Sequence, residues 1–122
     1  MNLGGLWLDG CEVTIEKEAW LTNAQGNFAF RGCRIENDGH LNLHGWAWLE
    51  RVFEDTEMVN RGEMRMDDGT EIFGSIENRG VIVVNGYIPV NGTIENHGKI
   101  IVEYGNIYAV RGEITGNAII KN

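Results

Sequence analysis

The chain of 122 residues contains one proline, two cysteines and only ten basic side chains. No run of about eighteen apolar residues occurs, so the sequence predicts no membrane span. Two cysteines, without a Cys-x-x-Cys or clustered His/Cys spacing, predict neither a secreted disulfide scaffold nor a zinc site. Eighteen acidic residues give a formal charge of −8, which argues against direct binding of nucleic acid because that binding needs a basic surface. We therefore expect no cofactor and no resident metal.

The N-terminus has no basic region followed by an apolar stretch, so the sequence predicts no signal peptide. We expect a cytoplasmic protein, either in the cell that makes it or in a host that receives it. The length fits a single domain over residues 1–122. Seventeen glycines and thirteen asparagines disfavour a helical bundle, because both residues are poor helix formers.

Many of these glycines and asparagines belong to an internal repeat. The pattern Asn-x-Gly-x-φ-x-φ, where φ is apolar, occurs six times with small variations, starting at Asn2, Asn23, Asn37, Asn60, Asn78 and Asn96. A second phrase, Ile-Glu-Asn, precedes three of the glycines, at residues 35–37, 76–78 and 94–96. Such self-similarity near a period of twenty residues is typical of stacked repeats.

The alternation within each copy predicts a short strand with one apolar face, bounded by turns at the glycines. A single coil cannot bury that face, but stacked coils share an interior. The chain is therefore predicted to be an all-β, single-domain parallel β-helix (a β-solenoid) of about six short coils. One expected column of stacked residues is Leu6, Phe28, Leu41, Met64, Ile82 and Ile100. An antiparallel sandwich would explain the turn spacing but not the constant phase of the phrase.

The phrases resemble the repeats of right-handed parallel β-helix proteins, including pectin-lyase-like enzymes and filamentous adhesins. An example is Gly92-Thr93-Ile94-Glu95-Asn96-His97-Gly98. The resemblance is architectural and implies a right-handed coil. Those enzymes are longer and carry loops that form a substrate cleft, which this sequence lacks. One segment, residues 45–59, breaks the pattern and predicts an irregular excursion from the stack.

Two polar columns follow from the repeat. Asn37, Asn60, Asn78 and Asn96 are expected to stack at one corner as a structural ladder, each amide bonding to the next. Glu36, Glu77 and Glu95 are expected to form an outward column, in which like charges repel one another. Relief by Arg34, Arg79 or His97 is favoured over a cation bound between the glutamates.

Two other groups of side chains have the residue types that chemistry requires. His40, His44 and Asp67 predict a polar site, but no serine or cysteine nucleophile falls in the same register, so no catalytic residue is expected. Cys11 and Cys33 each follow a glycine at equivalent positions of successive coils and are expected to stack. Their separation is compatible with a disulfide, and a packed thiol pair is favoured in a reducing compartment.

The outward positions of the later coils are apolar. Val81, Val83 and Ile101 predict an exposed patch, with Tyr87 and Tyr104 near the following bends, and such a patch commonly marks an interface. The favoured function is therefore a non-enzymatic binding or structural module that self-associates, with a protein partner as a further expectation. One alternative is an acidic inhibitor or decoy, for example phage-encoded, of a nucleic-acid-binding protein. A further alternative is a carbohydrate-binding or carbohydrate-active protein.

Overall fold

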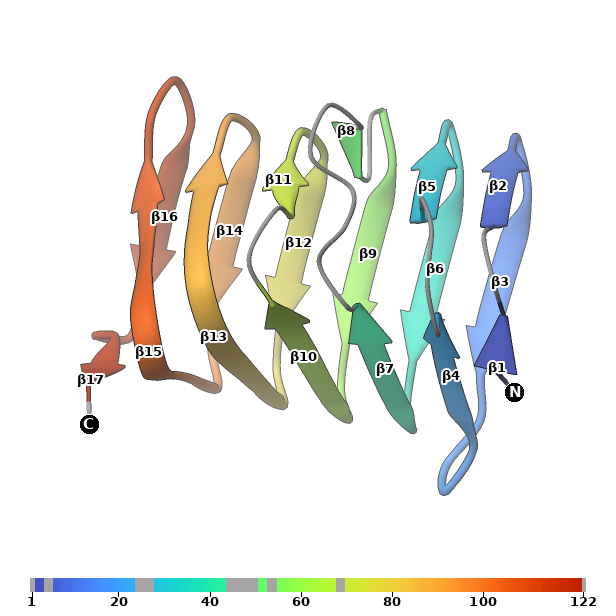
Figure 1. Cartoon of the computed structure of the whole chain (residues 1–122), viewed down its shortest axis with the longest axis horizontal. Coiled ribbons are helices and arrows are strands. Elements are labelled where there is room, and N and C mark those ends of the chain that lie inside the picture. The colour runs from blue at the N-terminus through green and yellow to red at the C-terminus, as the bar shows by residue number, and fades with distance from the viewer. Residues whose placement is uncertain are drawn as a thin grey trace.

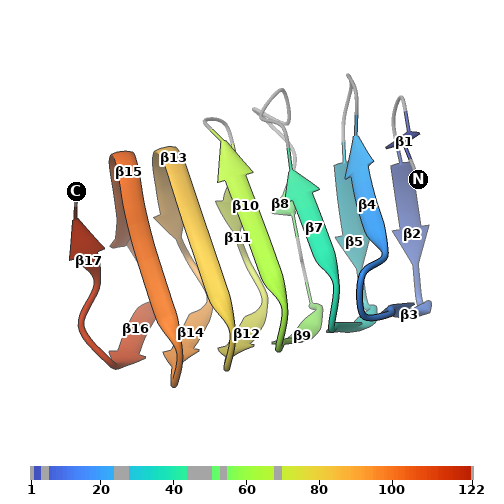
Figure 2. The ribbon, with the colours of Figure 1, turned by 90° about the horizontal axis from the view of Figure 1, so that it is seen from below.

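The computed structural model describes residues 2–3, 6–23, 28–43, 51–52, 55–67 and 70–121, and these residues form a β-solenoid of about five turns (Figure 1). All of the strand pairs are parallel. β1 and β17 lie at opposite ends of the stack (Figures 1 and 2). The predicted all-β, single-domain parallel β-helix is confirmed. The described residues include no helix that could cross a membrane.

Each coil has three sides. The first side is a six-stranded sheet of β3 (Glu12–Ile15), β6 (Arg34–Asn37), β9 (Glu57–Asn60), β12 (Ser75–Asn78), β14 (Thr93–Asn96) and β16 (Glu113–Gly116). The second side consists of β1 (Asn2–Leu3), β4 (Trp20–Asn23), β7 (His40–Leu43), β10 (Glu63–Asp67), the first halves of β13 (Val81–Val90) and β15 (Lys99–Ala109), and β17 (Ile120–Lys121). The third side consists of β2 (Leu6–Asp9), β5 (Phe28–Arg31), β8 (Arg51–Val52), β11 (Glu71–Ile72) and the second halves of β13 and β15.

The interior is a set of apolar columns, one for each inward position of a coil. On the first side, Ile35, Met58, Ile76 and Ile94 stack in register and are almost fully buried. On the second side, Leu41, Met64, Ile82 and Ile100 do the same. Because every coil adds one member to each column, burial grows with the number of coils, as expected for a stacked repeat.

The predicted register of the first two coils is wrong. Phe28 pairs with Leu6 on the third side, whereas Leu41 pairs with Leu21 on the second side. The copies of the motif that start at Asn2 and Asn23 therefore run on a different side from the later four. The physical reason is that alternation of period two is the same on every side of a coil, so the phrase alone does not say which corner it marks. In the first coil, Ile15 pairs with Asn37 at the first-side corner, and a turn follows in which the Ala19 amide donates to the Glu16 carbonyl.

The corner between the first and second sides carries the stacked asparagines, and its packing explains why a glycine stands two positions after each of them. A Cβ atom on Gly80 would lie 2.2 Å from the carbonyl oxygen of Gly62 in the coil before it. The amides of both Arg79 and Gly80 donate to the Asn60 carbonyl oxygen, which holds successive backbones in this close contact. Only a residue without a side chain fits at this position.

The predicted excursion at residues 45–59 is described only in part. Residues 45–50 and 53–54 lie outside the described residues. Arg51–Val52 is strand β8, which pairs with β11, and Glu57–Asn60 is strand β9, which sits between β6 and β12 in the stack.

Candidate functional site

The outward face of the first side carries the predicted glutamate column. Glu36, Val59, Glu77 and Glu95 lie directly beside one another in successive strands. Neighbouring parallel strands are about 4.8 Å apart, so Glu77 and Glu95 place two like charges at strand spacing. In the parallel column two positions earlier, Glu57 is followed by Ser75 and Thr93. The small side chains of Ser75 and Thr93 leave room between the glutamates.

This room is a groove of about 290 Å³, open to solvent. Its lining includes the carboxylates of Glu57, Glu77 and Glu95, with Arg34 at one end. The Thr93 hydroxyl donates to Ser75 Oγ at 3.1 Å, so these two hydroxyl groups are paired along the groove. The groove therefore presents acceptor oxygens to a cationic group.

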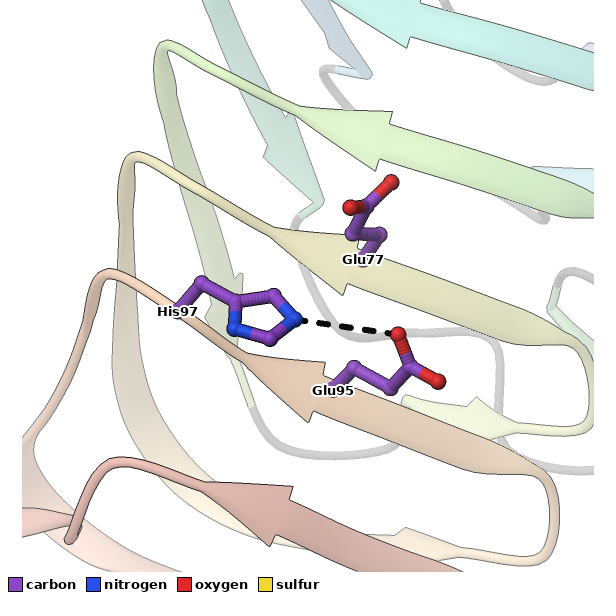
Figure 3. A group of neighbouring side chains, drawn as sticks. All are labelled: Glu77, Glu95 and His97. Carbon is purple, nitrogen blue, oxygen red and sulfur yellow. Dashed lines mark ion pairs between the residues drawn. The ribbon is translucent and has the colours of Figure 1, made fainter.

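At the corner end of the groove, one atom each from Glu77, Glu95 and His97 lies within 4.8 Å of the others (Figure 3). Carboxylate oxygens and an imidazole nitrogen are a donor set that divalent metals accept. Glu77 Oε1 already forms an ion pair with Arg79 Nη2, and Glu95 Oε2 lies 3.8 Å from His97 Nε2. A cation would have to compete with the Arg79 guanidinium for Glu77. The contacts therefore favour Arg79 and His97, rather than a bound cation, as the groups that offset the repulsion between the glutamates.

The predicted polar site is not assembled within the described residues. The His40 ring stacks on Trp20, with centroids 4.0 Å apart and planes at 12°, and its Nδ1 lies 3.5 Å from Glu63 Oε2. The neighbour of His40 on the N-terminal side is thus Trp20, because β4 and not β5 pairs with β7. Asp67 pairs in register with Asn85, and His44 lies outside the described residues.

The predicted apolar patch is partly covered. Val83 is only 8% exposed, so the expectation that it lies open to solvent is wrong. Arg65 of β10 and Glu103 of β15 form a 3.1 Å ion pair, and because β13 lies between these strands the pair spans its outward side. Val81 and Ile101 are half-buried.

Beyond the bend of β13 and β15, the aromatic residues are exposed. Tyr87 is 55% and Tyr104 59% exposed, and their rings meet edge to face with centroids 6.0 Å apart. Tyr108 is exposed on the same side, beside Pro89. We call Tyr87, Tyr104, Tyr108, Pro89 and Asn106 the tyrosine face. No member carries a charge, and Glu71 of β11 borders it.

The Arg65–Glu103 ion pair and the Trp20–His40 stack were missed by sequence reasoning. Glu103 is the extra residue where the pairing shifts, because Val84 pairs with Val102 but Asn85 pairs with Tyr104. The sequence did contain a signal for this shift. The segment Lys99–Tyr104 is one residue longer than Val81–Asn85, the segment of the previous coil with which it pairs. Trp20 was missed because its strand lies outside the Asn-x-Gly copies.

Comparison of the chain with protein-family models, with curated proteins and with solved structures found no match.

Proposed function

We propose that this protein is a non-enzymatic binding module that self-associates through the tyrosine face. The observation that carries the proposal is the exposure of Tyr87 and Tyr104, which lie in mutual contact on an uncharged part of an acidic molecule. Exposed tyrosines are typical of the centre of protein interfaces, since each buries a large area at little cost in side-chain entropy.

The charge distribution supports a second copy of the chain as the partner. Two molecules of charge −8 repel one another, and the repulsion is strongest between faces that carry glutamates. The tyrosine face is a surface on which two copies can approach without placing like charges in contact. A symmetric contact would also pair each Tyr87 with an aromatic ring of the partner, because an isologous interface uses the same patch twice.

Analytical ultracentrifugation over a range of protein concentrations tests this proposal. Tyr87→Ser and Tyr104→Ser should each weaken dimerisation at least about tenfold, the effect of losing roughly 1.4 kcal/mol of contact energy. Trp20→Ser is the matched control, because Trp20 is a similarly exposed aromatic residue on the second side. A wild-type protein that stays monomeric at high concentration contradicts self-association. Glycan binding that Tyr87→Ser abolishes would favour the carbohydrate-binding function instead.

The acidic first side favours a second candidate function, an inhibitor that occupies the basic groove of a nucleic-acid-binding protein. Its support is the gathering of Glu57, Glu77 and Glu95 along one groove, with Glu36 and Glu113 on the same outward face. A rigid group of carboxylates attracts a basic surface at low salt. Affinity capture at low and high salt tests it. Retention of a nucleic-acid-binding protein by wild type, lost in a Glu77→Gln/Glu95→Gln variant, would support this function.

A further inference from the structure

The two cysteines occupy equivalent corners of the first two coils. Each follows a glycine with positive φ, Gly10 at 66° and Gly32 at 61°, which turns the chain from the third side to the first. The next residues, Glu12 and Arg34, pair in register, and the Arg34 amide donates to the Cys11 carbonyl at 2.9 Å. Cys11 and Cys33 are therefore direct neighbours across a parallel strand pair. That spacing, about 4.8 Å, falls within the Cα separation that a disulfide spans.

The sulfur of Cys33 points toward the first coil. The Cys11 amide donates to Cys33 Sγ at 3.5 Å, and the same sulfur lies 3.4 Å from the Leu8 carbonyl oxygen. Cys33 is 4% exposed, whereas Cys11 is partly exposed. Both are free thiols in the structure. A small-molecule reagent therefore reaches Cys11 more readily, and Cys33 is placed to react with whatever forms there.

Cys11 and Cys33 are the first two members of a column of corner residues, and the later members are not cysteines. The next residue is Thr56, whose hydroxyl accepts a hydrogen bond from the Cys33 amide at 3.2 Å and donates to the Phe30 carbonyl at 3.1 Å. Gly74 and Gly92 follow in the later coils, and a Cβ on Gly92 would lie 1.9 Å from the Gly74 oxygen. Among the described residues, only the first two coils carry thiols at this corner, and the tight packing at Gly92 leaves no room for a side chain there.

We propose that Cys11 and Cys33 form a disulfide that joins the first coil to the second when a small-molecule disulfide such as glutathione disulfide is present. The Cys11 thiolate attacks one sulfur of glutathione disulfide, which breaks that S–S bond and releases one glutathione thiolate. The Cys33 thiolate then attacks the Cys11 sulfur of the mixed disulfide and releases the second glutathione. Two protein thiols are oxidised, one glutathione disulfide is reduced to two glutathione molecules, and the two thiol protons go to the released thiolates.

The cross-link would close residues 11–33, which include β3 and β4 of the first coil. That coil has a neighbour within the described residues on one side only, so it gains most from a covalent tie to the second coil. By restricting the unfolded chain, the bond should raise the midpoint of thermal unfolding by roughly 5–10 °C.

Peptide mapping after native oxidation tests the proposal. The folded protein is equilibrated with glutathione disulfide, alkylated, denatured and cut after lysine. Since Lys17 lies between the two cysteines and the next lysine is Lys99, an intramolecular disulfide leaves fragments 1–17 and 18–99 linked until a reductant is added. Finding both cysteines alkylated in the folded protein, or linked only between chains, would overturn the proposal.

Two variants separate the roles of the thiols. Cys33→Ser should accumulate the mixed disulfide at Cys11, because the second thiol is missing. Cys11→Ser should react with glutathione disulfide at least about tenfold more slowly than Cys33→Ser, since Cys33 is 4% exposed. Equal rates for the two variants would contradict the assigned order of attack. Oxidation of wild type should also proceed at a more reducing glutathione ratio when folded than in urea, and the reverse would show that the fold does not bring the thiols together.

Discussion

Two columns of the first side differ by a single residue in sequence and have opposite energetics. Asn37, Asn60, Asn78 and Asn96 form a buried ladder in which each Nδ2 donates to the Oδ1 of the next asparagine at 2.8–2.9 Å. Glu36, Glu77 and Glu95 precede three of these asparagines and form the column on the outward face, where Glu95 is exposed and Glu36 and Glu77 are half-buried. The same repeat therefore stacks asparagines, which stabilise one another, and glutamates, which repel one another.

The difference lies in hydrogen-bonding capacity. A neutral amide both donates and accepts, so identical amides at strand spacing satisfy one another, and the stack remains stable without water. An ionised carboxylate only accepts, so two of them at the same spacing repel. The glutamates are tolerated because they face water, where the repulsion is screened, and because Arg79 pairs with Glu77 and Arg61 lies 3.8 Å from Glu36.

Asn78→Asp should be the most damaging change. The new side chain keeps its shape and still accepts from Asn60, but it loses the donor to Asn96 Oδ1 and to the Lys99 carbonyl. It would also bury a charge against two oxygen atoms, which should cost about 4 kcal/mol of unfolding free energy at neutral pH. Urea denaturation followed by circular dichroism measures the loss, which should shrink on acidification because protonation restores one donor. A pH-independent loss would contradict this origin.

Asn78→Ala should cost about 2–3 kcal/mol, because it removes three buried hydrogen bonds: those from Asn60 Nδ2, to Asn96 Oδ1 and to the Lys99 carbonyl. The Asn60 amide then keeps the Val81 carbonyl as an acceptor, and Asn96 Oδ1 keeps the Gly98 amide as a donor. Asn117→Ala is the matched control: Asn117 is exposed, and its side-chain amide donates to the Gly98 carbonyl, so the loss should stay below about 1 kcal/mol. The same denaturation experiment serves both variants. Similar losses for the two would show that burial of the ladder does not set its contribution.

Glu95→Gln should stabilise the protein by about 0.5 kcal/mol, since it removes the like charge beside Glu77 and gives up only the 3.8 Å contact to His97. Differential scanning calorimetry should show a small rise in the unfolding temperature. Glu36→Gln is the control on the same column, because its neighbour is the uncharged Val59. An equal gain from both variants would mean that total charge, not the adjacent pair, is responsible.

Added salt should have the smallest effect. Raising the ionic strength from about 0.01 M to about 0.15 M shortens the screening length from about 30 Å to about 8 Å, so wild type should gain roughly 0.3 kcal/mol. The Glu95→Gln variant should gain less, as one repulsive contact is already gone. Urea midpoints at the two ionic strengths give the comparison, and a larger gain for the variant would argue against repulsion within the column.

The sequence predicted the later coils better than the first two. From Asn37 onward the Asn-x-Gly phrase sets the corner, and the glutamate and asparagine columns follow from it directly. In the first coil the corresponding residue is Ile15, and the four residues Glu16–Ala19 replace a two-residue turn. The similar phrases at Asn2 and Asn23 led to the wrong prediction that the strands after them lie on the same side as the strand after Asn37. A period-two pattern is the same on every side of a coil, so it does not distinguish the sides.

The sequence could not show which outward residues are covered. Val83 and Tyr87 both lie on the outward side of β13, yet Val83 is buried and Tyr87 is exposed. The cause is the ion pair between Arg65 and Glu103, which are 38 residues apart. Coverage of an outward position depends on long side chains from neighbouring coils, and their reach depends on the register.

Alternation and glycine placement specify the parallel solenoid and the two stacked columns, because both act locally and repeat in each coil. The tertiary structure alone decided which side each early strand joins, where the tyrosine face lies, and that Cys33 Sγ points at the first coil. These features depend on turn length and on contacts between coils. Such contacts exist only once the coils have stacked.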